Sequence, residues 1–320
     1  MCRYPQISVI IPVYNADKFL NYTIPSVLNQ SFSSIELILV NDGSTDNSLE
    51  ICLKFAQKDS RIKVIDKTNG GANPARGKGV EIARGEFIYF MDADDSLGPE
   101  ELQTLYVKIG NADLLMSGCK DEYTFGKLDY IKAILNHQIP LRLCGHLYRR
   151  VILESTFFNT PEDLRMGEDM LSNLMIAKNL TLFKSTKFTQ YQIDWSNSSS
   201  ISRSFVRSAS YEQMFDEMLT SIVSKLLNSR DLDSILAIQR FNALKFLLIE
   251  QKYLNTENPF IIKLFANNKF LPKKIYIIER FIMNIKPLAI SASLLRYWIL
   301  FNRKYNSSQI VLKKLIMCFY

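Results

Sequence analysis

Histidine and closely spaced cysteine are scarce in this sequence of 320 residues. Because the histidines are only His137 and His146, we expect no histidine-rich zinc site. The five cysteines lie far apart, no two have metal-ligand spacing, and their number is odd. We therefore expect reduced thiols, in the core or on the surface of a cytoplasmic protein, at positions 2, 52, 119, 144 and 318.

Long uncharged segments are also missing. No uncharged run reaches the roughly 20 residues that a membrane-spanning helix needs. The chain enters an apolar segment almost at once, but Pro12 interrupts it, so we expect no signal peptide.

The net charge of +7 is unevenly distributed. From Lys263 to the C-terminus there are eleven lysines or arginines and one acid, Glu279, a net +10 that leaves −3 for residues 1–262. We therefore expect no nucleic-acid partner for that first part. The basic tail also carries aromatic and aliphatic residues, so it either lies on an anionic membrane or forms a packed helical subdomain with a basic exterior.

Phosphate-binding glycine motifs do not fit the sequence. No G-x-G-x-x-G pattern follows the first strand-like segment, which argues against a dinucleotide fold. The glycine-rich segment 70–79 has five residues between Gly71 and Gly77, where a phosphate loop has four. Gly79 also stands where that loop has a serine or threonine for magnesium.

Strand-like and helical patterns alternate in the first 120 residues. The strand-like segments are 7–14, 35–40, 61–66, 86–91 and 112–118, and the helical ones are 17–30, 44–58, 73–84 and 99–109. We expect Pro25 to kink the first helix, Ser44 or Asp46 to cap the second, and Pro99 to lie near the start of the fourth. This α/β alternation predicts a mostly parallel sheet with helices on both faces, where ligands bind outside the carboxyl ends of the strands.

The alternation ends near residue 120. Residues 121–205 have an irregular pattern that ends in a serine-rich segment, and from about residue 208 the pattern is helical.

Three carboxylates follow the buried strand that ends near Met91. Asp92, Asp94 and Asp95 repel one another. A hard cation, Mn²⁺ or Mg²⁺, would offset that repulsion, because it binds one or two carboxylates and completes its shell with phosphate oxygens and water. The alternative is a solvated acidic turn in which an aspartate or serine caps the following helix.

Several motifs in order resemble one known family. They are "ISVIIPVYN" at 7–15, "VNDGSTDNS" at 40–48, "NGG" at 69–71 with the "AR" that follows, "GEFIYFMDADD" at 85–95 and "GED" at 167–169. Over roughly residues 6–175 the chain looks like the family 2 inverting glycosyltransferases, which have the GT-A fold. The resemblance implies a nucleotide-sugar-binding half at 1–120, an acceptor-binding and catalytic-base part of the same domain at 121–207, and a helical basic region at 208–320.

The resemblance places the nucleotide at the first strand ends. Tyr14 would stack on the base, or else be a core aromatic, and Pro12 would line the same pocket. Asp42 would accept a hydrogen bond from the base N3–H, which uracil and thymine carry and cytosine lacks; the alternative is a plain turn aspartate. Arg76 would face the diphosphate or its base, or else lie on the surface of a helix.

The same resemblance implies a separate role for each residue of the acidic turn. Asp92 would bond ribose or sugar hydroxyls, and Ala93 beside it belongs to the nucleotide-binding set. Asp94 would be the main metal ligand, and Asp95 is either a supporting ligand or a helix cap.

The catalytic base would lie on a second helix. The apolar residues Leu171, Leu174 and Met175 predict a helix that begins after Gly167. Glu168 and Asp169 would then lie on its first turn, where the helix dipole favours charged acids. The resemblance implies that Asp169 is the base, with Glu168 in support, and we expect Asp169 to be ionised near neutral pH.

One further candidate and three departures complete the comparison of motifs. His146, in "GHLYRR" at 145–150, could touch substrate, although a structural histidine is the interpretation that we favour. Asn41 stands where an aspartate is usual, and Pro74 and Gly77 alter the "NGG" segment, which leaves the detailed role of Arg76 open.

Taken together, the resemblance implies a metal-dependent inverting enzyme that uses a UDP-sugar. The acceptor would be a glycan or a lipid-linked glycan in bacterial capsule or lipopolysaccharide assembly, reached from the cytoplasmic face of the membrane. Two alternatives stay open: another metal-dependent nucleotidyl or phosphoryl transferase, and a non-catalytic protein that binds sugar nucleotides or membranes.

Overall fold

The computed structural model describes residues 4–136, 138–161, 164, 167–194, 208–250 and 256–271, together with 283, 288, 292–296 and 298–299. His137 and most of the basic tail therefore lie outside the described residues. The chain divides into two compact units, residues 1–205 and 206–320.

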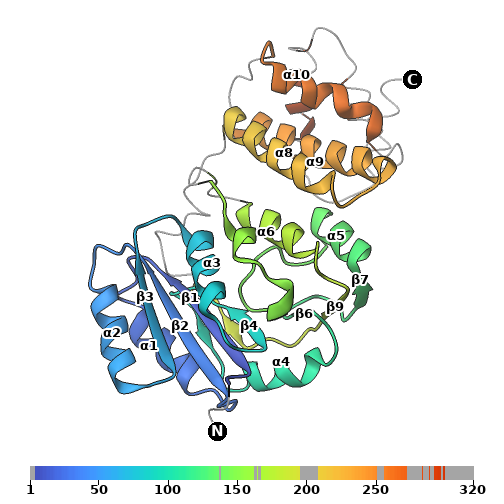
Figure 1. The fold of residues 1–320 in the computed structure, drawn as a ribbon. Coiled ribbons are helices and arrows are strands. Elements are labelled where there is room, and N and C mark those ends of the chain that lie inside the picture. Colours follow the sequence, from blue (N-terminus) through green and yellow to red (C-terminus); the bar gives the residue numbers. More distant parts are fainter. Residues whose placement is uncertain are drawn as a thin grey trace. The chain divides into compact units, whose positions relative to one another are not determined.

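The first unit opens with an alternation of parallel strands and helices (Figure 1). Its elements are β1 (Ile7–Val13), α1 (Leu20–Leu28), β2 (Ile35–Asp42), α2 (Ser48–Lys58), β3 (Ile62–Lys67), α3 (Ala72–Ile82) and β4 (Phe87–Phe90). The four strands pair in parallel in the order β3-β2-β1-β4. Because β1 to β3 advance in one direction and β4 returns to the other side of β1, right-handed crossovers put α1 and α2 on one face of the sheet and α3 on the other.

The inner parallel strands β1, β2 and β4 are buried because helices cover both faces of the sheet. Every residue of β1 and of β2 is buried. Gly79 lets α3 approach β1 closely, since a Cβ at this position would lie 2.4 Å from Cγ2 of Ile10. The predicted strand and helix order of this half is confirmed.

Pro25, the residue expected to kink the first helix, lies inside α1, and the helix continues past it to Leu28. The prediction that Ser44 or Asp46 caps α2 was wrong: the N-cap residue is Asn47. Asp46 nevertheless accepts a hydrogen bond from the Ser48 backbone N–H at 2.9 Å, which satisfies one free donor of the first turn.

The second half of this unit extends the sheet with short strands. Its elements are β5 (Ser96–Leu97), α4 (Glu101–Ile109), β6 (Leu114–Met116), β7 (Thr124–Gly126), α5 (Lys127–Leu135), β8 (Leu147–Arg149), the 3₁₀ turns Arg150–Ile152 and Ser155–Phe158, α6 (Glu168–Ile176), β9 (Leu182–Ser185) and β10 (Tyr191–Gln192). The eight-stranded sheet has the order β3-β2-β1-β4-β8-β6-β9-β7, and β10 pairs with β5 in a separate antiparallel ribbon. β8 is antiparallel to both neighbours, so the sheet is mixed but mostly parallel.

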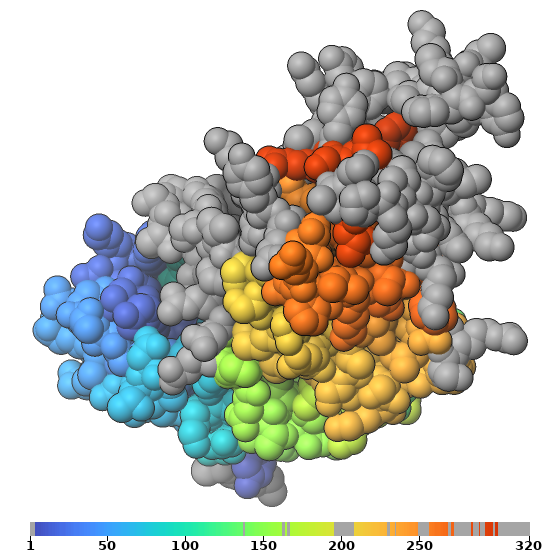
Figure 2. Space-filling view, turned by 90° about the horizontal axis from the view of Figure 1, so that it is seen from above, coloured from blue at the N-terminus to red at the C-terminus, as the bar shows by residue number. Residues whose placement is uncertain are grey.

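The second unit is helical where it is described. It contains α8 (Ala209–Val223), α9 (Ser229–Glu250), α10 (Pro259–Ala266) and the 3₁₀ turn Asn267–Phe270, and these residues form a continuous surface in the space-filling view (Figure 2). Asp216 of α8 accepts hydrogen bonds from Arg240 of α9 at 2.6 Å and from Lys263 of α10 at 2.8 Å. This buried carboxylate ties the three helices around an apolar core. Among the described residues, none of the helices is long and apolar enough to cross a membrane.

Candidate functional site

Three predicted nucleotide contacts meet at one edge of the sheet. Tyr14 follows β1, Asp42 ends β2, and the acidic turn that begins at Asp92 follows β4. These three strands are adjacent and parallel, so their carboxyl ends lie side by side. This edge is where a doubly wound sheet binds ligands.

Tyr14 is positioned to meet a ligand. Its side chain is 53% exposed, so the alternative of a core aromatic was wrong. Pro12, two residues earlier, is buried within β1. An exposed ring next to this edge can stack on a flat base, and stacking by Tyr14 stays a prediction.

Asp42 is more than a plain turn residue. Its buried carboxylate forms an ion pair with Lys67 and accepts backbone hydrogen bonds from Gly70 at 3.0 Å and Gly71 at 2.7 Å. It therefore holds the glycine segment that follows β3 against the end of β2. Gly43 makes this approach possible, because its φ is +70° and a Cβ there would lie 2.7 Å from the Asn69 backbone nitrogen.

The departure at Asn41 has a local consequence. The Asn41 amide donates to Asp66 Oδ1 at 2.7 Å, so the side chain binds a carboxylate on the neighbouring strand β3. An aspartate at this position would instead place two carboxylates together.

The acidic turn is fastened from two sides. Asp95 is buried and accepts hydrogen bonds from the Tyr191 hydroxyl at 2.5 Å and the Asp194 backbone N–H at 2.9 Å. The Thr23 hydroxyl of α1 lies 2.9 Å from the carbonyl oxygens of both Ala93 and Asp95. Burial, together with the charges of its acidic neighbours, raises the pKa of Asp95 to about 6.

The helix-cap interpretations of this turn were wrong. The N-cap residue of α4 is Glu100, and no side chain forms a cap hydrogen bond there. Asp95 instead accepts hydrogen bonds from Tyr191 of β10 and from Asp194, two residues beyond the end of that strand. A supporting part for Asp95 at a metal stays a prediction.

Asp92 and Asp94 are the more open carboxylates of the turn. The Asp92 side chain is 44% exposed and Asp94 is half-buried. Within the described part of the chain, no group of three or more His, Cys, Asp or Glu side chains is arranged to hold a metal. A Mn²⁺ or Mg²⁺ ion that takes most of its ligands from phosphate and water does not need such a group. The carboxylate oxygens of this turn therefore fit a cation of that kind, with Asp94 as the proposed ligand.

Arg76 of α3 connects this turn to the predicted base. Its guanidinium donates from Nη2 to Asp92 Oδ1 at 2.8 Å and from Nη1 to Asp169 Oδ1 at 3.3 Å. Nη1 also donates to Asn73 Oδ1 at 2.7 Å. The residue is only 4% exposed, so the alternative of a surface arginine was wrong.

The predicted base lies on the first turn of α6, as expected. Gly167 adopts φ +83° at the N-cap, and Glu168 and Asp169 begin the helix. The second carboxylate oxygen of Asp169 accepts a hydrogen bond from the Leu143 backbone N–H at 3.3 Å. The acidic turn and this helix were predicted separately, and the structure brings them to a single guanidinium.

The pKa of Asp169 departs from the direction that the helix dipole suggested. Burial raises the pKa above its ordinary value, and the positive charge of Arg76 offsets part of that rise. Burial and the charge of Asp169 raise the pKa of Glu168 to about 7. Glu168 Oε2 is buried and has no hydrogen-bond partner among the described residues.

His146 is fully buried in this unit. Its Nδ1 accepts a hydrogen bond from the Ser117 backbone N–H at 3.2 Å. Burial and the nearby charge of Arg142 lower the pKa of His146 to about 3, so the ring is neutral. This environment fits a structural histidine and leaves no exposed ring for substrate.

The sequence analysis missed several residues at this site. Cys144 lies with its Sγ 3.1 Å from Asp92 Oδ1, and burial keeps it a thiol by raising its pKa. The Tyr22 hydroxyl lies 3.0 Å from both the Asp94 carbonyl oxygen and Asp194 Oδ2. Tyr191 and Lys67 also touch predicted site residues. None of these residues belongs to a local motif with recognisable spacing.

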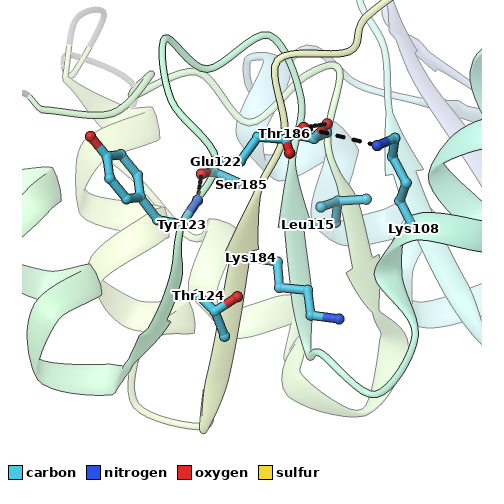
Figure 3. Close-up of a pocket in the computed structure, with 8 residues that line it drawn as sticks. All are labelled: Lys108, Leu115, Glu122, Tyr123, Thr124, Lys184, Ser185 and Thr186. Atoms are coloured by element: carbon cyan, nitrogen blue, oxygen red, sulfur yellow. Dashed lines mark hydrogen bonds and ion pairs between the residues drawn. The ribbon is translucent and has the colours of Figure 1, made fainter.

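A hollow away from the predicted site residues lies between α4, β6, β9 and residues 122–124 (Figure 3). It has a volume of about 240 Å³, and none of the predicted site residues lines it. Its polar groups bind one another: Thr186 Oγ1 donates to Glu122 Oε1 at 2.8 Å, and Lys108 Nζ lies 3.9 Å from the same oxygen.

The family model "Glycosyl transferase family 2" matches residues 8–164, which include the nucleotide edge and the acidic turn. This part of the chain belongs to glycosyl transferase family 2. EpsJ of Bacillus subtilis, named an uncharacterized glycosyltransferase, is 35% identical over 190 residues, which are 53% of this chain and 55% of EpsJ. The minor teichoic acid biosynthesis protein GgaA of the same organism is 30% identical over 249 residues, which are 70% of this chain and 55% of GgaA. The chain thus spans about half the length of these two relatives.

Solved structures show that the family 2 domain has the GT-A fold. Staphylococcus aureus TarS 1–349 in complex with UDP-GlcNAc matches with a TM-score of 0.70 at 22% identity, covering 95% of this chain and 93% of that one. The mannosyltransferase PcManGT of Pyrobaculum calidifontis, in complex with GDP-Man and Mn²⁺, matches with a TM-score of 0.53 at 13% identity, covering 96% and 89%. The mostly parallel sheet and the helical C-terminal unit agree with the fold class predicted from the sequence.

Proposed function

We propose that the chain is a metal-dependent inverting glycosyltransferase that moves a sugar from a UDP-sugar to a hydroxyl group. The observation that carries this proposal is the bridge made by Arg76, which binds Asp92 at the end of β4 and Asp169 at the start of α6. One guanidinium thus holds a carboxylate of the proposed donor site and the proposed proton acceptor close together, and a single displacement between two bound substrates needs such proximity.

The donor would lie along the strand edge. Tyr14 stacks on the base, Asp42 accepts the N3–H, and Asp92 binds ribose or sugar hydroxyls. Asp94 would hold Mn²⁺ or Mg²⁺, and the cation, when bound, neutralises charge on the diphosphate leaving group. The UDP-GlcNAc bound by TarS and the Mn²⁺ present with PcManGT support this choice of donor and metal.

The chemical step belongs to α6. Asp169 takes the proton from the acceptor hydroxyl as that oxygen attacks the anomeric carbon from the face opposite the leaving UDP. The C–O bond to UDP breaks as the new C–O bond forms, so no covalent enzyme intermediate is needed. A partly buried carboxylate whose pKa is raised by desolvation is a stronger proton acceptor than an ordinary aspartate.

The product of the reaction tests this proposal. A panel of UDP-sugars with Mn²⁺ should give UDP for at least one donor, in an amount that rises with added acceptor. Release of pyrophosphate instead would assign the site to nucleotidyl transfer. Absence of any donor turnover, with nucleotide binding retained, would support the non-catalytic alternative.

Base selectivity is the first quantitative expectation. UDP should bind better than CDP, and Asp42→Ala should remove much of that difference, because a hydrogen bond to a charged group contributes about 1.5–3 kcal/mol. Calorimetric titration of both nucleotides measures it. Since Asp42 also holds Gly70 and Gly71, Lys67→Met is the matched control: it removes the side chain that pairs with the Asp42 carboxylate but leaves that carboxylate as the acceptor. Equal affinities for UDP and CDP in the parent protein contradict the assignment.

We further propose that the acceptor is a glycan or a lipid-linked glycan. We also propose that the protein is cytoplasmic and binds the inner membrane surface through its basic tail. The name of GgaA, a teichoic acid biosynthesis protein, supports a cell-surface polymer. Each basic residue near an anionic surface contributes about 1 kcal/mol. Anionic vesicles should therefore float the chain at low salt, and deletion beyond Phe270 should abolish this. If the chain floats equally with neutral and with anionic vesicles, the tail is a structural subdomain and not a membrane-binding segment.

A further inference from the structure

The Arg76 side chain is buried, and its partners are protein atoms at the donor edge and on α6. It is 5% exposed, whereas its partners Asp92 and Asp169 are 44% and 26% exposed. Four of its hydrogen-bond distances lead to protein atoms: Asn73, Asp92, Asp169 and the Cys144 sulfur at 3.5 Å. Both terminal nitrogens are thus already engaged by protein atoms, and little of the side chain is left exposed to a ligand.

The bridge needs the flat, two-armed guanidinium of an arginine and not the single charged nitrogen of a lysine. A guanidinium is planar and rigid, so acceptors on its two terminal nitrogens are fixed in direction as well as in distance. The loop before β8 holds the same two carboxylates from another side: Leu143 donates its N–H to Asp169, and Cys144 lies against Asp92. Each carboxylate is therefore held by Arg76 and by one residue of this loop.

We propose that Arg76 is a positioning residue that locks Asp92 on the donor side and Asp169 on the acceptor side into one arrangement before substrates bind. The proposal rests on the proposed function, and it replaces the expected contact of Arg76 with the diphosphate. Arg76 does not touch the reacting atoms; it acts through the two carboxylates. Its loss should affect the alignment of base and donor and should not depend on the number of phosphates in the nucleotide.

Two substitutions separate the two roles. Arg76→Lys keeps the charge but replaces the fork by a point charge, and Arg76→Gln removes the charge. A lysine still binds phosphate well, so a phosphate ligand would be largely rescued by Arg76→Lys. If Arg76 instead positions two carboxylates with its two terminal nitrogens, Arg76→Lys would not restore activity. Arg61→Lys is the matched control, because Arg61 is a partly buried arginine that pairs with Asp59 at 2.8 Å outside this site.

The readouts are the dissociation constants of uridine, UMP and UDP, and the steady-state constants for the UDP-sugar. We expect kcat and kcat/KM to fall together by about 10²-fold in both Arg76 variants, because misplacement of a reacting group by an ångström costs about that much. Any loss of affinity should be equal for the three ligands, and Arg61→Lys should behave as the parent. A loss of affinity that grows from uridine to UDP, or rescue of kcat by Arg76→Lys, overturns the proposal.

A second measurement does not depend on turnover. Urea unfolding of Arg76→Lys, Asp92→Asn, Asp169→Asn and the two double variants with Arg76→Lys tests the bridge itself. Because partners in one network are not additive, each double variant should lose less stability than the sum of its single variants. Additive losses for either pair overturn the bridge. If the parent releases no UDP from any donor, the proposed function fails, and this unfolding cycle still decides whether Arg76 holds both carboxylates.

Discussion

Asp169→Asn should lower turnover by about 10²–10⁴-fold, the usual range for the loss of a general base, while UDP-sugar and metal bind almost as in the parent. The asparagine keeps the shape of the side chain and an oxygen that can accept from Arg76, but it cannot take a proton. The donor contacts proposed for Tyr14, Asp42 and Asp94 lie on other elements. Steady-state UDP release and calorimetric binding of the UDP-sugar measure the two halves of this expectation.

The neighbouring carboxylate provides the control. Glu168→Gln should reduce turnover less. Glu168 begins the same helix, but among the described residues it forms no hydrogen bond with Arg76. Near-parental turnover of Asp169→Asn, with a dead Glu168→Gln, would make Glu168 the base. If both variants stay active, α6 carries no chemistry and the inverting mechanism is wrong.

The pH dependence of kcat/KM follows from the same two carboxylates. A base works in its deprotonated form, so activity falls as the pH drops through its pKa. Because burial raises the pKa of Asp169, the acid limb should lie above the ordinary range for an aspartate, and it should vanish from the residual rate of Asp169→Asn. Glu168 has a pKa of about 7, so a limb near neutral pH that disappears in Glu168→Gln belongs to Glu168. The two groups interact, and each variant also shifts the remaining limb.

The parallel half of the fold could be predicted from the sequence because its signals are local and repeated. β1 and β2 are continuous apolar runs, as strands buried on both faces must be. β7, β8 and β9 are only three or four residues long, which is too short for a periodic pattern to show. Their order in the sheet depends on pairing between distant segments, so residues 121–205 gave only an irregular pattern.

The site divides in the same way. The motifs placed Asp92 and Asp169 on the correct elements, since each follows a strand or begins a helix. The direction of Arg76 and the hydrogen bond from Tyr191 to Asp95 could not be predicted, because the partners are separated by 93 and 96 residues and share no pattern. The helix dipole suggested a readily ionised Asp169, but burial by other elements dominates its pKa. A helix start can be predicted from neighbouring residues, but burial of Asp169 depends on segments distant in the sequence.

Asp94→Ala should abolish the part of UDP binding that Mn²⁺ supports and should leave the fold intact. The turn around Asp94 is held by its backbone: the carbonyl oxygen of Asp94 lies 3.0 Å from the Tyr22 hydroxyl, and the carbonyl of Ala93 accepts from Thr23. Alanine keeps these bonds. It removes the carboxylate through which the proposed cation would be held, so the diphosphate would lose its bridge to the protein.

The sign of the effect should reverse without metal. Two like unit charges a few ångströms apart repel by roughly 1–4 kcal/mol in surroundings between bulk water and a protein surface. Without Mn²⁺, the Asp94 carboxylate repels the diphosphate, so Asp94→Ala should bind UDP at least as well as the parent does. With Mn²⁺, the parent should bind UDP much more tightly and the variant should show no gain. Calorimetric titration of UDP with and without Mn²⁺ gives all four affinities, and Asp129→Ala, which removes an exposed carboxylate on α5, is the matched control. Equal gains from Mn²⁺ in the parent and in Asp94→Ala would exclude Asp94 as the ligand, whereas a gain lost in Asp94→Ala but kept in Asp129→Ala would assign the cation to this carboxylate.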